Sequence, residues 1–423
     1  MKNSLKSLLP LVALLLAVCL SFWLSPAPKG QPDVEYWGHY QRVGPGLGFI
    51  VNHDSYGYLQ VAHEPGRLLQ PREVRQSRPL YALLGAAAGY PFAVALRLAG
   101  RRGLVPAGAL AQAHYYGIYV GYVLLNGLAL LASLVLFKKL FNQFSAGRGE
   151  SWQFYALAWV LVANPITKAF FWTAHQQMFA FLVPLGCLAL AMRLTQRPVL
   201  RWAALSGWAL ALGLLPLLYG SFVLAWPALA FGLLGLKNLT ISRRPRWPVT
   251  LGKLAVSAGL FAVPTLLWIG LLRTQGTTYY NHEAERFHQL VWLVEARHLP
   301  PTQYLALVAS KLTEYVGSLQ LMGLWLLAAA GLYAATAWRL GGTRALMPPA
   351  AGRAWAWVAG WFVLFFALLG YYPERLAFTL LPLVLCLGAA LLPHWPRRYA
   401  RPLLLATAAG WHLYVLLSYG PFS

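Results

Sequence analysis

The sequence predicts an all-α fold, a polytopic bundle of transmembrane helices with about eleven spans. The chain has 423 residues, of which 59% are hydrophobic and only 11% are charged. A soluble domain is nearer half apolar, with about a quarter of its residues charged. Apolar stretches long enough to cross a bilayer recur along the chain, and short loops rich in Lys and Arg separate them. We therefore treat residues 1–423 as a single integral membrane domain.

The charge balance supports this class. The chain has 34 Lys and Arg against 11 Asp and Glu, a formal net charge of +23. Nucleic-acid-binding proteins gather such charge in a basic domain or patch, whereas here it lies in the loops between apolar stretches, as in positive-inside topology. We therefore expect membrane lipids as partners and no nucleic acid. The three cysteines fall inside apolar stretches, which predicts core residues rather than a disulfide framework.

The first apolar run, Leu8–Leu24, follows Lys2 and Lys6 and precedes a Ser-Pro-Ala-Pro segment. A cleaved signal peptide is one interpretation. We prefer an uncleaved anchor, because the run lies at the short end of the length needed to span. Both interpretations place the next segment outside, and the anchor places the N-terminus in the cytoplasm.

The run Trp202–Leu236 holds no charge. As one helix at 1.5 Å per residue it would far exceed a hydrocarbon core of about 30 Å, so we expect a turn near Pro216–Gly220. The expected spans are Leu8–Leu24, Tyr115–Phe137, Trp152–Ile166, Phe170–Met192, Trp202–Leu218, Tyr219–Leu236, Val249–Leu272, Val316–Trp338, Ala354–Leu369, Leu376–Leu392 and Leu403–Leu417.

One further apolar stretch, Pro79–Leu98, decides the topology. If it spanned, every later loop would change sides, and several Lys/Arg-rich loops would lie outside, against the positive-inside rule. We therefore place it as an interfacial or re-entrant helix at the outer surface. The loops at Lys138–Arg148, Lys237–Arg246 and Arg397–Arg401 then face the cytoplasm, and Glu150 is the one acidic residue on that side.

Two large outer segments follow from this topology. Residues 25–114 form the first, which carries the interfacial helix, and residues 273–315 form the second. The composition, rich in Leu, Ala, Arg and Gly, suits a bacterium. We expect the protein in the inner (plasma) membrane, with its active face periplasmic or extracellular.

Asp54 is the leading candidate for chemistry. It is flanked by His53, Tyr56 and Tyr58, and a short apolar run precedes it. A carboxyl group beside apolar surface is expected to have a raised pKa and to serve as a general base. A metal site using His53 and Asp54 is an alternative, so a divalent metal remains possible, but no compact ligand spacing supports one. We assign no metal ligand.

Two groups of basic residues could bind phosphate. Arg75 and Arg78 lie just before Pro79, where guanidinium groups could recognise phosphate bidentately. Anchoring to anionic lipid is the equally good alternative. Glu374-Arg375 is the charged pair of the last outer hairpin. The alternative to phosphate binding by Arg375 is a structural ion pair between these two residues.

This pattern resembles the GT-C superfamily of membrane glycosyltransferases, which includes protein O-mannosyltransferases and aminoarabinose transferases. An acid followed by aromatics opens the outer loop after the first span, here Asp54. Arg78 begins a basic Pro-Leu-Tyr entry to a juxtamembrane helix. Asn164-Pro165 ends the third span, and Arg375 precedes a span that contains Pro382.

The resemblance implies a polyprenyl-phosphate sugar as donor and Asp54 as catalytic base. Arg375, with Arg75 or Arg78, would hold the leaving phosphate. Glu374, His53 and Tyr58 are further candidate substrate-binding residues. One departure is evident: many members have a second acid in the loop after the third span, and here that loop, Asn164–His175, has none.

The expected function is transfer of a sugar from a polyprenyl-phosphate donor to an acceptor hydroxyl on a glycan, lipid or protein, at the outer face of the membrane. A transporter or flippase for a lipid or solute is one alternative. It would need polar residues near mid-bilayer, and the sequence offers chiefly His175, Gln176 and Gln177 near a span end. A non-catalytic scaffold with the same fold is the other. A structure in which Asp54 and Arg375 converge on one outer-facing cavity would favour the enzyme over both alternatives.

Overall fold

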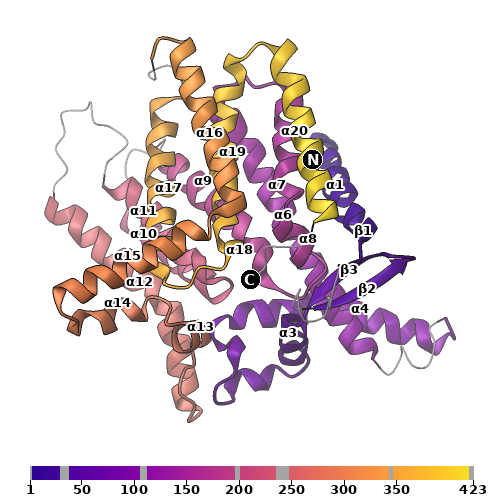
Figure 1. Ribbon diagram of the computed structural model, residues 1–423. Coiled ribbons are helices and arrows are strands. Elements are labelled where there is room, and N and C mark those ends of the chain that lie inside the picture. The colour runs from indigo at the N-terminus through magenta and orange to yellow at the C-terminus, as the bar shows by residue number, and fades with distance from the viewer. Residues whose placement is uncertain are drawn as a thin grey trace.

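The computed structural model describes residues 2–28, 38–104, 112–195, 201–234, 247–342 and 346–418, with side chains from residue 8 onward. Figure 1 shows a bundle of helices with a small sheet at its lower end. The longer helices are α1 (Lys2–Ser21), α4 (Pro79–Arg101), α6 (Ala113–Phe144), α9 (Phe179–Thr195), α12 (Trp247–Thr274), α15 (Pro301–Gly317), α16 (Gln320–Arg339), α17 (Pro349–Leu369) and α20 (Arg397–Leu417). The shorter ones are α3 (Asp54–His63), α7 (Ser151–Val162), α8 (Pro165–Phe170), α10 (Trp202–Gly213), α11 (Ala225–Leu233), α13 (His282–Phe287), α14 (Val291–Glu295), α18 (Glu374–Ala377) and α19 (Leu381–Leu391).

Single turns of 3₁₀-helix connect many of these helices. They are η1 (Phe22–Leu24), η2 (Pro65–Leu69), η3 (Val74–Ser77), η4 (Gln176–Met178), η5 (Leu215–Leu217), η6 (Gly220–Leu224), η7 (Ala296–His298), η8 (Phe378–Leu380) and η9 (Leu392–His394).

The predicted membrane bundle is confirmed. Within the described residues, eight helices are long and apolar enough to cross a membrane. Apart from α4, each coincides with a predicted span. The other predicted spans match shorter apolar helices, namely Leu8–Leu24, Ser151–Val162, Trp202–Leu217 and Gly220–Leu233. The chain turns between Leu217 and Gly220, as the position of Pro216 predicts. The count of eleven spans stays a prediction.

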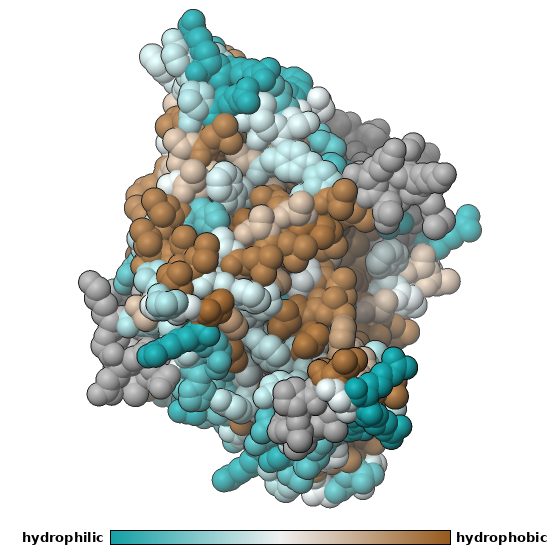
Figure 2. Space-filling model, turned by 90° about the vertical axis from the view of Figure 1, so that its right-hand side faces the viewer, coloured by the Kyte–Doolittle hydropathy of each residue, from teal (hydrophilic) through white to brown (hydrophobic). Residues whose placement is uncertain are grey.

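The surface has the pattern of a protein that crosses a bilayer. Figure 2 shows apolar side chains gathered across the middle of one face and hydrophilic side chains at both ends. Single large apolar residues are widely exposed, among them Leu267 and Leu327. Exposure of such apolar surface is unfavourable in water but costs nothing against lipid tails.

The core lies where helices are apolar all round. The span Glu374–His394 is 78% buried and the span Gln176–Thr195 is 72% buried, whereas α12 and α16 are each only 11% buried. A helix that is hydrophobic on every side belongs at the centre of a bundle, and α9 and α19 occupy that place. α12 and α16 lie at the periphery, with most of their surface available to lipid.

α4 packs antiparallel along the first turns of α6. A Cβ at Gly89 would meet the backbone of Ile118, and one at Gly117 would meet that of Ala93. Glycine at these positions lets the two backbones approach closely. In Figure 1, α4 lies at the lower end of the molecule, beside the sheet. Its length and composition would suit a span, so its placement along the outer surface remains a prediction.

A three-stranded antiparallel sheet also lies at this end, and sequence analysis did not predict it. Its order is β1 (Ser25–Pro26), β3 (Leu47–Asn52), β2 (Gly38–Gly44). Gly46, at φ +69°, forms the tight turn between β2 and β3. The strand β3 ends at Asn52 and so delivers the chain directly to Asp54.

The two predicted outer segments meet at this same end. α3, α4, α13 and the sheet gather there in Figure 1. Thr277 Oγ1 donates a hydrogen bond to the Leu69 carbonyl at 2.6 Å, which joins the second segment to the first. Asp33, Glu35 and the predicted cytoplasmic loop Lys237–Arg246 lie outside the described residues.

Candidate active site

A polar cavity of about 920 Å³ opens at this end of the bundle. Asp54, Arg75, Arg78, His53 and Arg375, all singled out from the sequence, line it together. Residues of both predicted outer segments and of the ends of membrane helices contribute to its wall. The cavity therefore joins groups that are more than 300 positions apart in the chain.

Local hydrogen bonds place Asp54 at the start of α3. The Asn52 Oδ1 atom accepts a hydrogen bond from the Asp54 backbone N–H at 2.8 Å, an Asx-type turn that favours helix initiation. The negative side chain then lies in the first turn of the helix, where the dipole favours it. Asn52 is itself fixed, because its N–H donates to the Thr173 Oγ1 atom at 3.2 Å.

Arg75 and His175 hold the Asp54 carboxylate from two sides. The Arg75 guanidinium donates to Oδ1 at 2.8 Å, and His175 Nε2 lies 3.4 Å from Oδ2. The Arg75 guanidinium also lies 4.1 Å above the ring of Tyr58, a cation–π contact that fixes its orientation. The Asp54 side chain is 40% exposed to the cavity, whereas that of Arg75 is 9% exposed.

The raised pKa expected for Asp54 is wrong. Burial does raise the pKa of this carboxyl, but the hydrogen bond from His175 and the positive charge of Arg75 outweigh burial and hold the pKa below its usual range. Asp54 is thus ionised at neutral pH. The sequence argument weighed the apolar run before Asp54 but could not know that Arg75 would reach it.

His175 faces Asp54 as a neutral imidazole. Its Nδ1 atom accepts a hydrogen bond from the Gln177 N–H at 3.1 Å, so the ring proton is on Nε2, toward Asp54. Burial lowers the pKa of His175 to about 4, against the opposing effect of Asp54. The membrane helix begins at Gln176, later than the predicted Phe170, so His175 stands just outside it.

The loop before His175 is clamped in place. The Asn126 side chain, fully buried in α6, donates to the carbonyls of Phe171 at 2.9 Å and Thr173 at 2.8 Å. The Ala174 N–H donates to the Ser55 hydroxyl of α3 at 3.0 Å. These bonds tie α6, the loop and α3 together, so the spacing of Asp54 and His175 is set by the core.

A second ion pair lines the same cavity. Arg78 pairs with Glu283 of α13, and the Ser77 hydroxyl lies 3.4 Å from the same carboxylate. Burial raises the pKa of Glu283, but Arg78 outweighs burial and lowers it overall. Sequence analysis did not single out Glu283, because nothing local to it indicated a partner.

The turn that carries both arginines is rigidly held. Glu73 caps η3 by accepting from the Arg75 N–H at 3.1 Å. The buried Gln76 side chain accepts from the Tyr280 N–H at 2.9 Å, and the backbone carbonyl of Gln76 accepts from the Trp268 indole N–H at 2.9 Å. The turn is therefore fixed to both the second outer segment and α12.

The side chains of the last predicted pair, Glu374 and Arg375, make different contacts. The Arg375 guanidinium lies 5.8 Å from the centre of the Phe170 ring and lines the cavity. The Glu374 carboxylate turns away and accepts a hydrogen bond from the Leu321 N–H at 3.0 Å, at the start of α16. Glu374 and Tyr58 are outside the cavity lining, whereas the other predicted site residues are part of it.

The cavity suits an anion. Four arginines line it, namely Arg75, Arg78, Arg286 and Arg375, against the carboxylates Asp54 and Glu283. The four guanidinium groups exceed the two carboxylates by two positive charges. Among the residues that the structure describes, no group of three or more His, Cys, Asp or Glu side chains is placed to hold a metal ion.

The arrangement is that of an integral membrane protein with a charged cavity at one end of its bundle. No protein-family model and no curated protein matches the chain. Among solved structures, it is similar to ArnT from Cupriavidus metallidurans, crystallised with undecaprenyl phosphate, with a TM-score of 0.50 and 17% sequence identity over 95% of this chain. The chain covers 64% of the length of that structure. The fold is therefore ArnT-like, which confirms the predicted GT-C resemblance at the level of fold.

Proposed function

We propose that this protein is a membrane glycosyltransferase that moves a sugar from a polyprenyl-phosphate donor to an acceptor hydroxyl, at the outer face of a bacterial inner membrane. The observation that supports this most is the convergence of Asp54, Arg75, Arg78 and Arg375 on one cavity. The ArnT-like fold adds support, since that protein was crystallised with undecaprenyl phosphate.

The cavity charge fits the leaving group. In the transfer, the acceptor oxygen bonds to the anomeric carbon while the bond from that carbon to the phosphate oxygen breaks. The lipid phosphate then gains a negative charge and becomes a monoester with up to two charges. The two excess positive charges of the lining match it, and preorganised cations act most where charge develops. We assign this role to Arg375 and Arg78.

Asp54 is assigned as the acceptor of the hydroxyl proton. Its lowered pKa makes it a weak base, so proton transfer to it occurs late, when the forming bond has already made the hydroxyl acidic. His175 and Arg75 keep the carboxylate ionised and oriented before the acceptor arrives.

The test uses purified protein in lipid nanodiscs, with a polyprenyl-phosphate donor carrying labelled sugar and a bacterial envelope extract as the source of acceptors. We expect label to leave the polyprenyl phosphate and appear in a new product. Movement of a fluorescent polyprenyl phosphate between the leaflets of proteoliposomes, with no loss of sugar, would instead support a flippase. If the protein caused neither sugar loss nor lipid movement, that result would support a scaffold.

A further inference from the structure

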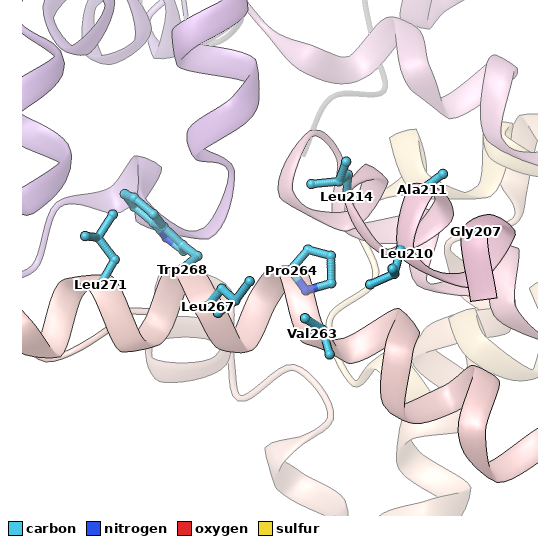
Figure 3. Close-up of a pocket in the computed structure, with 9 residues that line it drawn as sticks. All are labelled: Gly207, Leu210, Ala211, Leu214, Val263, Pro264, Leu267, Trp268 and Leu271. Carbon is cyan, nitrogen blue, oxygen red and sulfur yellow. The ribbon is translucent and has the colours of Figure 1, made fainter. Parts of the chain in front are cut away.

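Two features of the structure lie outside the charged cavity. The hollow between α10 and α12, drawn in Figure 3, is lined by apolar residues and glycine throughout the part of the chain that the structure describes, so it offers no ionisable group. Lys168 of α8 differs, because it is ionisable and yet lies in the protein interior, with only 5% of the residue exposed. A buried cation is stable only where its charge is paired or hydrogen-bonded. The partners of Lys168 therefore indicate its role.

Lys168 binds the C-terminal end of α20. Its ammonium group donates hydrogen bonds to the carbonyls of Val415 at 2.9 Å, Leu416 at 3.0 Å and Ser418 at 2.6 Å. The last carbonyls of a helix have no N–H partner within the helix, and a positive charge is favoured beside them. An ammonium group has three N–H donors, which matches these three carbonyls. The lysine thus fastens α8 to α20.

The start of α8 is fixed to the end of α7. Asn164 Oδ1 accepts a hydrogen bond from the Thr167 N–H at 3.0 Å and so caps α8, while Asn164 Nδ2 donates to the Leu161 carbonyl of α7 at 2.7 Å. A helix of six residues is too short to be stable by itself. The position of α8 is therefore set by these contacts at its start and by Lys168.

Phe170, the last residue of α8, contacts two groups of the charged cavity. Its ring centre lies 4.8 Å from that of His175 and 5.8 Å from the guanidinium carbon of Arg375. His175 in turn holds the Asp54 carboxylate. Phe170 is 1% exposed, so its ring acts on the cavity through the residues that it contacts. One ring therefore lies between the group that holds the proposed base and a group proposed to bind phosphate.

We propose that Lys168 and Phe170 are positioning residues for this site: Lys168 holds α8 against α20, and α8 holds Phe170 between His175 and Arg375. The inference rests on the function proposed above for Asp54 and Arg375. Without the attachment to α20, Phe170 can shift, and both His175 and Arg375 then lose the surface against which they pack. A displacement of about 1 Å in a catalytic site costs up to about 10²-fold in rate.

Lys168→Met tests the attachment, because methionine keeps an unbranched side chain and removes all three donors. Lys139→Met, at an exposed lysine of α6, is the control. The measurement is the Kd of the purified protein for undecaprenyl phosphate, which requires no sugar transfer. We expect Lys168→Met to weaken binding about tenfold, Lys168→Arg, which keeps the charge and several donors, by about threefold at most, and Lys139→Met not at all.

Phe170→Leu tests the other end of α8. It leaves the contacts of Lys168 in place, so it decides the matter even if Lys168→Met does not fold. Phe144→Leu, at a fully buried phenylalanine at the far end of α6, removes the same atoms from the core away from the cavity. Both variants should lower Tm, but only Phe170→Leu should weaken undecaprenyl phosphate binding, by about fivefold or more. Equal Kd values for Phe170→Leu and the wild type would overturn the positioning role.

A double-mutant cycle with Arg375→Ala separates positioning from general destabilisation. If Phe170 acts through Arg375, Phe170→Leu should change the Kd by less than about twofold once Arg375 is replaced. The same factor in both backgrounds would overturn the inference, since the loss would then come from stability alone.

The cycle also distinguishes this inference from the transferase assignment. In a protein that transfers sugar, Phe170→Leu should lower kcat about tenfold as well, through His175 and Asp54. Coupled binding in a protein that transfers no sugar would support the positioning role and refute the transferase.

Discussion

Two ion pairs line one cavity, and they differ in how they are built. Asp54 and Arg75 belong to the same outer segment, and the loop of His175, clamped by Asn126, closes on them. Arg78 and Glu283 belong to different segments, and the contact depends on how α13 lies against the first segment. The first pair is fixed by the buried core, whereas the second is fixed by the meeting of two surface segments.

The two ion pairs are expected to have different roles. A carboxylate that must meet a reacting hydroxyl needs a set position, because catalytic groups act within a narrow range of geometry. An arginine that binds a phosphate can exchange one anion for another. We therefore expect changes at Asp54 to affect the chemical step, and changes at Glu283 to affect donor binding.

The largest expected effect is that of Asp54→Asn. Asparagine keeps the size and can accept from Arg75, but it cannot take the acceptor proton. General-base contributions are typically 10²–10⁴-fold, so kcat should fall by that factor, with little change in Tm in detergent. Glu64→Gln, an exposed acid just after α3, is the control and should keep full activity. Full activity in Asp54→Asn would remove the catalytic assignment.

Next in size is Arg375→Ala. Removing one charged partner of a bound phosphate costs about 2–5 kcal/mol, which should appear as a large rise in KM for the donor. Arg375→Lys should restore only part of the binding, since Lys lacks the planar fork. The exposed Arg297→Ala serves as control. Unchanged donor affinity in both Arg375 variants would return this residue to a structural role.

Glu283→Gln should have a smaller effect and the opposite sign. Loss of its charge frees the Arg78 guanidinium for phosphate and makes the cavity more positive, so KM for the donor should fall, by no more than about tenfold, the equivalent of about 1.4 kcal/mol. Glu285→Gln, on the same helix but exposed, should change nothing. A loss of kcat as large as that of Asp54→Asn would show that the two pairs share one task.

The clamp around Asp54 should also make stability depend on pH. The pKa of His175 is lowered from 6.5 to about 4, so the unfolded chain binds a proton below 6.5 that the folded protein does not. Stability is therefore full above 6.5 and falls as the pH drops toward 4, by at most about 1.4 kcal/mol per pH unit. His175→Gln should flatten this slope in thermal unfolding measured in detergent. Identical slopes in both proteins would argue against a neutral, buried His175.

The smallest perturbation tests whether both pairs lie on the outer side. The three native cysteines are buried, so single exposed cysteines can be read against a low background. In intact cells, an impermeant thiol reagent should label Glu285→Cys and spare Asn142→Cys, at the far end of α6. Labelling of the cysteine at position 142 would refute the predicted orientation.

The sequence by itself determined the class and the candidate residues. Hydropathy and loop charge predicted a membrane helical bundle, because a bilayer demands long apolar helices whatever their packing. The turn in the run Trp202–Leu236 followed from Pro216 for a local reason. Asp54 was selected as an acid beside apolar surface, and Arg75, Arg78 and Arg375 as guanidinium groups able to bind a phosphate.

Only the tertiary structure decided how these groups pair. The ionised state of Asp54 depends on Arg75 and His175, which lie 21 and 121 positions away in the chain, and a pKa responds to distance in space rather than in sequence. Glu283 and Arg78, 205 positions apart, and the turning away of Glu374 toward Leu321 have no local signal for the same reason. The small sheet that leads into Asp54 likewise depends on pairing between strands distant in the chain, β1 with β3.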